Sequence, residues 1–228
     1  MNVSESISLY PYFQVRTETG LSFGGSQTWF PVKSGVRERM LHMGGCGLVS
    51  ACDFILYDHS GHKPVDKDRY MTFLRKMSRF RYPVFPKFGS LSFQQPIFIN
   101  QYFRSEDRKE RLHFLFLNTK KKRLAVIRDS LRNNHPVILV IGTRVLQPFS
   151  KKGVNFYKLY EGKLTLSAKD VSRHFVTVTG ILCPADISEP LYLEISSWGQ
   201  RFYVNYDELS EYIAHYSLPL ISSIYYVK

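Results

Sequence analysis

The hydrophobic period of this chain changes near Pro136, and that change limits the folds open to it. Before this proline, apolar residues recur at helical spacing in several segments, whereas the later apolar runs are short and typical of buried strands. The later runs follow one another closely in sequence, so they should pair antiparallel. Helices first and sheet second predict an α+β fold, with N-terminal helices packed against a C-terminal antiparallel sheet.

The clearest helical pattern begins at Cys46. Within residues 46–57, apolar residues fall at i, i+3, i+4, i+7 and i+8, and these are Leu48, Ala51, Cys52, Ile55 and Leu56. Three more helices are expected, one from about Pro64 or Asp66 to Phe80, one beginning near Pro96, and one over residues 122–133.

Strands are expected in the second half of the chain. Short buried runs cover residues 137–142, 175–182, 191–197 and 201–206, with 221–227 as a fifth. Residues 8–32 should form short strands and turns, and residues 113–117 a short strand. Because no repeat or linker interrupts the chain, we predict one domain over 1–228, helical over about 44–134 and sheet over about 135–228.

The net charge of +12 is the one unusual global property. Such a charge attracts nucleic acid, acidic lipid or acidic substrates and says little about the fold. Only residues 120–123 form a true basic run, which is typical of a solvated helix start. The aromatic residues mostly fall at core periods rather than between basic residues, so nucleic-acid binding is the weakest of three functional readings.

The three cysteines, Cys46, Cys52 and Cys183, show no metal-binding spacing, so no metal and no cofactor is predicted. The N-terminal residues have neither the basic region nor the apolar core of a signal peptide. No apolar run approaches the length needed to span a membrane. We therefore expect a cytoplasmic protein without a membrane partner.

Cys46 is the best candidate nucleophile. It follows Gly44-Gly45 and precedes Gly47 at a predicted helix start, where free N–H groups and the helix dipole favour a thiolate. Gly45 and Gly47 would let the backbone approach a substrate carbonyl, and the Cys46 N–H could donate to a developing oxyanion. Cys52, on the apolar helix face, and Cys183, beside a proline, are expected to be structural.

His174 is the candidate base for Cys46. It begins the strand run Val176-Thr177-Val178, and its separation from Cys46 is close to that of papain-like Cys–His pairs. A lone strand histidine is more often a hydrogen-bonded core residue, so the rest of the pattern has to support the role.

That support comes from Ser196-Ser197-Trp198-Gly199. Strand alternation places Glu194, Ser196 and Trp198 on one face. There Ser196 could orient an imidazole with support from Glu194, and Trp198 could shield the contact from water. Read alone, these four residues are a strand end and a turn.

Taken together, these motifs resemble the papain-like cysteine peptidase superfamily, and most closely bacterial peptidases of the bacteriocin-leader-processing type and their uncharacterised relatives. Cys46-Gly47 opening a helix, His174 opening a strand and Ser197-Trp198-Gly199 closing another carry the resemblance. It covers about residues 44–206 and includes the helix-to-strand segment 131–139. It implies a papain-like fold and catalytic roles for Cys46, His174 and Ser196.

Two departures from the family keep two functions open. The family usually has Asn or Asp where Ser196 stands, and an oxyanion-hole Gln a few residues before the cysteine. Here that stretch is Arg39-Met40-Leu41-His42-Met43, and Gln27, farther upstream, is out of register. The first function is a thiol peptidase or amidase that forms an acyl-enzyme on a peptide or protein substrate. The alternative is a papain-like fold that binds a peptide or protein without turnover.

Overall fold

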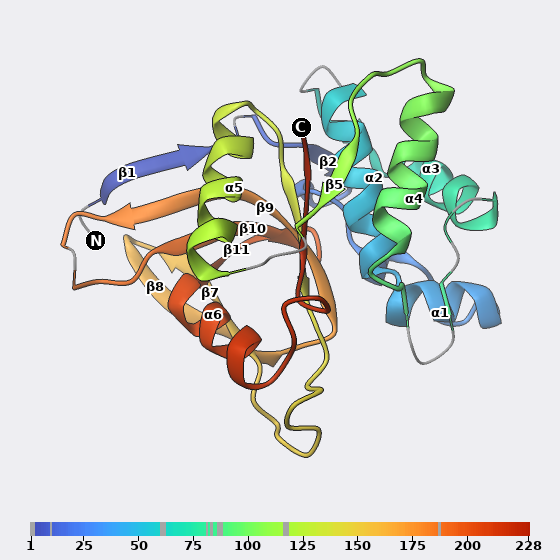
Figure 1. The fold of residues 1–228 in the computed structure, drawn as a ribbon. Helices are drawn as coiled ribbons and strands as arrows, with labels where there is room; N and C mark the ends of the chain where they lie inside the picture. The colour runs from blue at the N-terminus through green and yellow to red at the C-terminus, as the bar shows by residue number, and fades with distance from the viewer. Residues whose placement is uncertain are drawn as a thin grey trace. The chain divides into compact units, whose positions relative to one another are not determined.

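The computed structural model describes residues 3–9, 11–59, 63–80, 82, 84–85, 89–115, 119–186 and 188–228 (Figure 1). The chain divides into two compact units. The sheet unit consists of Met1–Tyr10, Phe114–Ser196 and Arg201–Tyr226, and the helical unit of Pro11–His113, Ser197–Gln200 and Val227–Lys228.

The helical unit combines four α-helices with a small sheet. The helices are α1 (Val36–Gly44), α2 (Cys46–His59), α3 (Lys67–Phe80) and α4 (Gln94–Ser105). The sheet has the order β3-β2-β4, with β2 (Gln14–Thr17) antiparallel to β3 (Gly20–Phe23) and parallel to β4 (Val65–Asp66). A short 3-10 helix, η1 (Gln27–Trp29), follows β3.

Helix α2 forms the centre of the helical unit. Four of the five residues of the predicted apolar face, Leu48, Ala51, Cys52 and Ile55, are fully buried, whereas Leu56 is partly exposed. The carboxylate of Asp53 on the same helix is also buried, and accepts hydrogen bonds from the Gly25 N–H (2.9 Å) and the Tyr70 hydroxyl (2.6 Å). These bonds fasten the segment before η1 to the middle of α2.

The sheet unit contains α5 (Lys120–Arg132), α6 (Tyr206–His215) and most of one large sheet. The sheet has the order β5-β12-β6-β9-β10-β11-β7-β8, and β1 (Val3–Ser8) pairs with β9. Its other strands are β5 (Leu112–Phe114), β6 (Val137–Ile141), β7 (Val154–Tyr160), β8 (Lys163–Val171), β9 (His174–Pro184), β10 (Tyr192–Ser197), β11 (Gln200–Asn205) and β12 (Ile224–Val227).

Helix α5 belongs to the sheet unit because it packs on β1, β6 and β9. Its buried Arg123 donates from Nε to the Tyr206 hydroxyl (3.2 Å) and from Nη2 to the Ser210 hydroxyl (2.9 Å), both on α6. A buried guanidinium must keep such partners because an unpaired buried charge is costly. The predicted division near residue 134 therefore differs from the observed one, which groups α5 with the sheet.

The large sheet curls on the side where His174 lies. Strands β9 and β7 are separated by β10 and β11 in the sheet order, yet the rings of His174 and Phe156 have centroids only 6.3 Å apart. Neighbouring strands are about 4.8 Å apart in a flat sheet, so three strand spacings would exceed this distance. The curl gives His174 a buried position.

The α+β class is confirmed, with six α-helices and a large antiparallel sheet among the described residues. The predicted helices correspond to α2, α3, α4 and α5, and the predicted later strands to β6, β9, β10, β11 and β12. The prediction lacked α1, α6, β1, β4, β7 and β8. Of the predicted strand 113–117, residues 116–117 lie outside the described part of the chain.

Within the described part of the chain, no single helix is long and apolar enough to cross a membrane. Helices α1 and α2 pass that test only as a pair, and they are bent by 75° at the break between them.

Candidate active site around Cys46

Gly45 creates the sharp bend that places Cys46 at a helix start. The Gly45 N–H donates to the Leu41 carbonyl (2.9 Å) to end α1, while the Gly45 carbonyl accepts from the Val49 N–H (2.9 Å) to begin α2. A β-carbon at Gly45 would meet the Leu41 carbonyl oxygen at much less than van der Waals distance. The bend therefore requires glycine at this position.

Cys46 is the first residue of α2, as predicted, and its exposed fraction is 9%. Met43, in the last turn of α1, is 76% exposed. The side-chain amide of Gln27 donates from Nε2 to the Met43 carbonyl at 3.5 Å, the long limit of a hydrogen bond. Gln27, out of register in the sequence, thus lies beside the turn that leads into Cys46.

Gly47 sits in a crowded polar cluster. Its carbonyl accepts from Gln95 Nε2 on α4 (3.0 Å), and the same nitrogen contacts the Tyr82 hydroxyl (2.7 Å). A β-carbon at position 47 would lie 2.5 Å from the Ser90 Cβ and 2.7 Å from the Tyr82 oxygen. The expected role of Gly47 is to let the backbone approach a substrate, and the structure adds a packing requirement at this position.

The Gly47→Ala substitution is expected to lower the free energy of unfolding by about 1–3 kcal/mol, since an added methyl overpacks this site. Urea denaturation measures the change, with Thr72→Ala on the exposed side of α3 as a control within about 0.5 kcal/mol of the unaltered protein. A more stable Gly47→Ala variant, as in an uncrowded helix, would show that Ser90 and Tyr82 do not restrict this position.

His174 is the first residue of β9 and belongs to the sheet unit. It is opposite Ile141 of β6 in the ladder and lies close to Phe156. Burial lowers the pKa of His174 to about 4, because desolvation disfavours the imidazolium. The ring is therefore neutral near pH 7 and can accept a proton, although with a low affinity for it.

Ser196 and Glu194 lie on the side of the sheet opposite to His174. Ser196 of β10 is directly across from Thr177 of β9, and directly opposed residues share a face. Alternation along β9 puts His174 and Val176 on the other face from Thr177. The expectation that Ser196 orients the imidazole does not agree with this register.

The Glu194 carboxylate is engaged on its own face. It accepts from the Thr179 hydroxyl (2.9 Å) and the Tyr203 hydroxyl (3.4 Å), and Arg201 Nε lies 3.6 Å away. These contacts give Glu194 a structural role within the sheet unit, in place of the expected support of His174.

Trp198 and Gly199 form the two-residue turn between β10 and β11. Their φ values are 50° and 72°, and positive φ at both central residues is characteristic of a type I′ turn. The Gly199 carbonyl accepts from the Ser22 hydroxyl (2.8 Å) and the Phe23 N–H (3.0 Å) in the helical unit. The interpretation of this motif as a strand end and a turn is confirmed. The shielding role assumed that Trp198 lies in the strand, whereas β10 ends at Ser197.

The structure thus keeps part of the predicted site together. Cys46, Gly45 and Gly47 are adjacent in the helical unit, which also contains Trp198, whereas His174, Ser196 and Glu194 belong to the sheet unit. Gln27 is the addition that sequence reasoning had set aside. Its position depends on the Asp53 anchor before η1, which no local spacing reveals.

The two other cysteines are buried, as their predicted structural roles require. Burial, reinforced by the neighbouring Asp53 carboxylate, raises the pKa of the Cys52 thiol well above its ordinary value. Cys183 Sγ contacts Arg128 Nη2 at 3.4 Å. Cys52 is therefore unreactive in the folded protein and serves as an internal reference for Cys46.

Comparison with protein-family models, with curated proteins and with solved structures finds no match to this chain.

Proposed function

We propose that this chain is a papain-type thiol hydrolase in which Cys46 attacks the carbonyl carbon of a peptide or amide substrate. The observation that carries the proposal is the position of Cys46 as the first residue of α2, directly after the Gly45 bend. A helix start supplies N–H groups and a partial positive charge where a thiolate and an oxyanion would need them.

The Gln27 side chain supplies a candidate oxyanion donor. Among the residues that the structure describes, its amide contacts the Met43 carbonyl at the long distance of 3.5 Å, so it can exchange that acceptor for a substrate oxygen at little cost. Removing a single oxyanion donor typically costs about 10²–10³ in rate, which is the size of the contribution proposed for Gln27.

In the proposed reaction, His174 accepts the thiol proton as sulfur bonds to the carbonyl carbon and the carbonyl π electrons move to oxygen. When the tetrahedral intermediate collapses, the carbon–nitrogen bond breaks and the imidazolium returns its proton to the leaving amine. Water, deprotonated by His174, then attacks the thioester and releases the acid together with the free thiol. Because burial lowers the pKa of His174 to about 4, we expect slow turnover that declines only below that pH.

Alkylation of the native protein between about pH 5 and 9 tests the pair, with each modified cysteine followed by peptide mass spectrometry. We expect Cys46 to react well below pH 8, where an ordinary thiol of pKa about 8.5 is mostly protonated. The His174→Ala variant should lose this low-pH reactivity.

The buried Cys52 reports unfolding in the same spectra, since it should stay unlabelled in both proteins. If Cys46 reacts no faster than an ordinary thiol, or reacts equally fast in the His174→Ala variant, the two residues do not act as a pair.

A second function, peptide or protein binding without turnover, is favoured by one observation. Ser196 and Glu194 lie on the opposite face from His174, so neither supplies the orienting group that the family normally has. The two functions make opposite predictions for a Cys46 variant.

A further inference from the structure

The loop between β6 and β7, residues 142–153, presents a large apolar side chain to solvent. Phe149 is 99% exposed, and Leu146 and Val145 in the same loop are 50% and 43% exposed. In Figure 1 this yellow segment extends away from the strands that it joins. Three exposed apolar side chains gathered in one loop are typical of a surface that contacts a partner.

The loop is fixed at its base. Arg144 donates from Nε to the Lys152 carbonyl and from Nη2 to the Lys151 carbonyl (3.0 Å). The Leu146 N–H donates to the Tyr216 carbonyl and Gln147 Nε2 to the His215 carbonyl, each at 3.2 Å. These bonds tie the loop to the end of α6, so Phe149 is held outward by a stable support.

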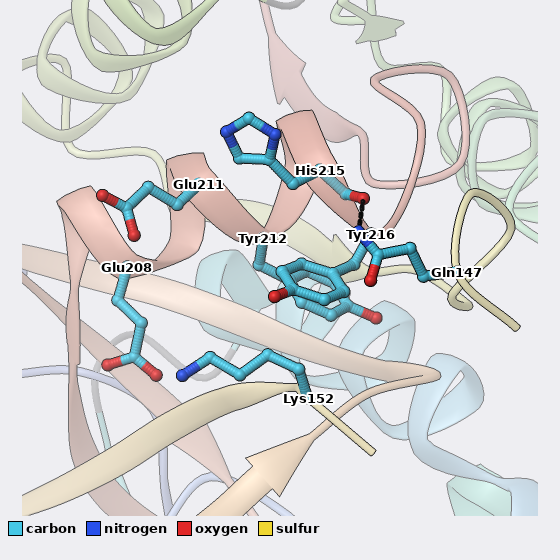
Figure 2. Close-up of a pocket in the computed structure, with 7 residues that line it drawn as sticks. All are labelled: Gln147, Lys152, Glu208, Glu211, Tyr212, His215 and Tyr216. Atoms are coloured by element: carbon cyan, nitrogen blue, oxygen red, sulfur yellow. Dashed lines mark hydrogen bonds between the residues drawn. The ribbon is translucent and has the colours of Figure 1, made fainter. Parts of the chain in front are cut away.

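A cavity of about 370 Å³ lies between this loop and α6 (Figure 2). Two of the polar side chains that line it, Glu208 and Tyr212, already have partners in the fold. Glu208 accepts from the Asn155 N–H (2.8 Å) and the Tyr157 hydroxyl, and Tyr212 donates to the Gly142 carbonyl (2.7 Å). These side chains therefore hold α6 and the base of the loop in place. The exposed tip around Phe149 is the better candidate for a binding surface.

The charged residues within the loop are all basic. The loop contains Arg144, Lys151 and Lys152 and no acidic residue, and exposed Arg173 lies at its base, where its N–H contacts the Gly142 carbonyl (3.4 Å). The opposing charges are on neighbouring elements and are Glu208, Glu211 and Asp170, of which Asp170 accepts from the Gly153 N–H. Cations flanking an exposed aromatic side chain fit an anionic surface with an apolar interior.

We propose that the 142–153 loop attaches the protein to anionic lipid membranes, with Phe149 inserted at the interface and the flanking lysines against the headgroups. The attachment is peripheral and needs no spanning segment, so the lack of a membrane-spanning run in the sequence does not oppose it. Anionic headgroups favour each nearby basic residue, and buried aromatic surface adds to the affinity.

Co-sedimentation with phosphatidylcholine vesicles, with and without phosphatidylserine, tests the proposal. We expect binding to the anionic vesicles that weakens with salt and is much weaker on neutral vesicles. Phe149→Ala should lower the partition coefficient about tenfold or more, and Lys151→Glu with Lys152→Glu by about fivefold per lysine or more.

Two matched control variants distinguish vesicle binding through this loop from non-specific adsorption of the protein. Tyr160→Ala removes another exposed aromatic side chain, from the β7–β8 hairpin, and Lys121→Glu with Lys122→Glu makes the same charge change on α5. Both should bind within about twofold of the unaltered protein. No binding to anionic vesicles, equal binding to neutral ones, or equal losses in the control variants would each overturn the proposal. If Phe149 contacts only a protein partner, the protein should show no binding to anionic vesicles.

Discussion

The Cys46→Ser variant is expected to hydrolyse peptide amides at least about a thousandfold more slowly than the unaltered protein, while it keeps the affinity for the same peptides. A serine hydroxyl at this helix start has a far higher pKa than a thiol, so a weak base such as His174 cannot activate it. A library of fluorogenic peptide amides measures kcat/KM, and fluorescence anisotropy of labelled peptides measures binding.

Cys183→Ser is the matched control, since it makes the same atomic change at another buried cysteine. It should leave kcat/KM within about twofold, because Cys183 and His174 lie at opposite ends of β9 and substitutions at well-separated positions usually act independently. Binding without hydrolysis by the unaltered protein, retained in Cys46→Ser, would support the binding function instead. Turnover that survives Cys46→Ser would remove Cys46 from the mechanism.

The elements that could be predicted from sequence are those with a buried apolar pattern. Most residues of helix α2 and all residues of strand β6 are buried, so both segments are continuously rich in apolar residues. The β7–β8 hairpin was missed because it lies at the sheet edge, where Leu159 and Leu166 are exposed and polar residues alternate with them. Only the start of β7, where Val154 and Phe156 are buried, carries a core signal.

Helix α6 was missed although its sequence contains a start signal. The Asn205 side chain accepts from the N–H groups of Asp207 and Glu208, an N-cap followed by acidic residues in the first turn. Leu209 and Ile213 then supply a helical apolar spacing. The preceding strand β11 runs directly into this cap, and the strand pattern obscured it.

The candidate site shows where local patterns stop being informative. Alternation correctly placed Glu194 and Ser196 on one face of β10, yet only the pairing with β9 decides whether His174 shares it. That pairing includes a bulge between Glu194 and Ile195, which no single-strand pattern reveals. Likewise, Gln27 reaches the end of α1 through a fold-back of β2 and β3.

The stability of the protein is expected to fall as the pH rises from about 4 to 7, through Asp53. Burial raises the pKa of this carboxyl from 3.8 to about 7, although hydrogen bonds from Tyr70 and Gly25 oppose the shift. Between these two values the folded state holds a proton that the unfolded state has released, so higher pH favours unfolding. At about 1.4 kcal/mol for each pKa unit, the full effect is about 4 kcal/mol.

The Asp53→Asn variant isolates this contribution because its side chain does not titrate, while its oxygen can still accept from Tyr70 and the Gly25 N–H. Urea denaturation of both proteins across about pH 4–8 should show the variant gaining about 4 kcal/mol relative to the unaltered protein. Tyr70 and Cys52, which face Asp53, have raised pKa values and stay neutral throughout this range. Asp129→Asn at an exposed position should show no such gain. If the difference in unfolding free energy between Asp53→Asn and the unaltered protein stays constant with pH, Asp53 is ionised at both ends of the range. Its two hydrogen bonds would then outweigh the cost of burial.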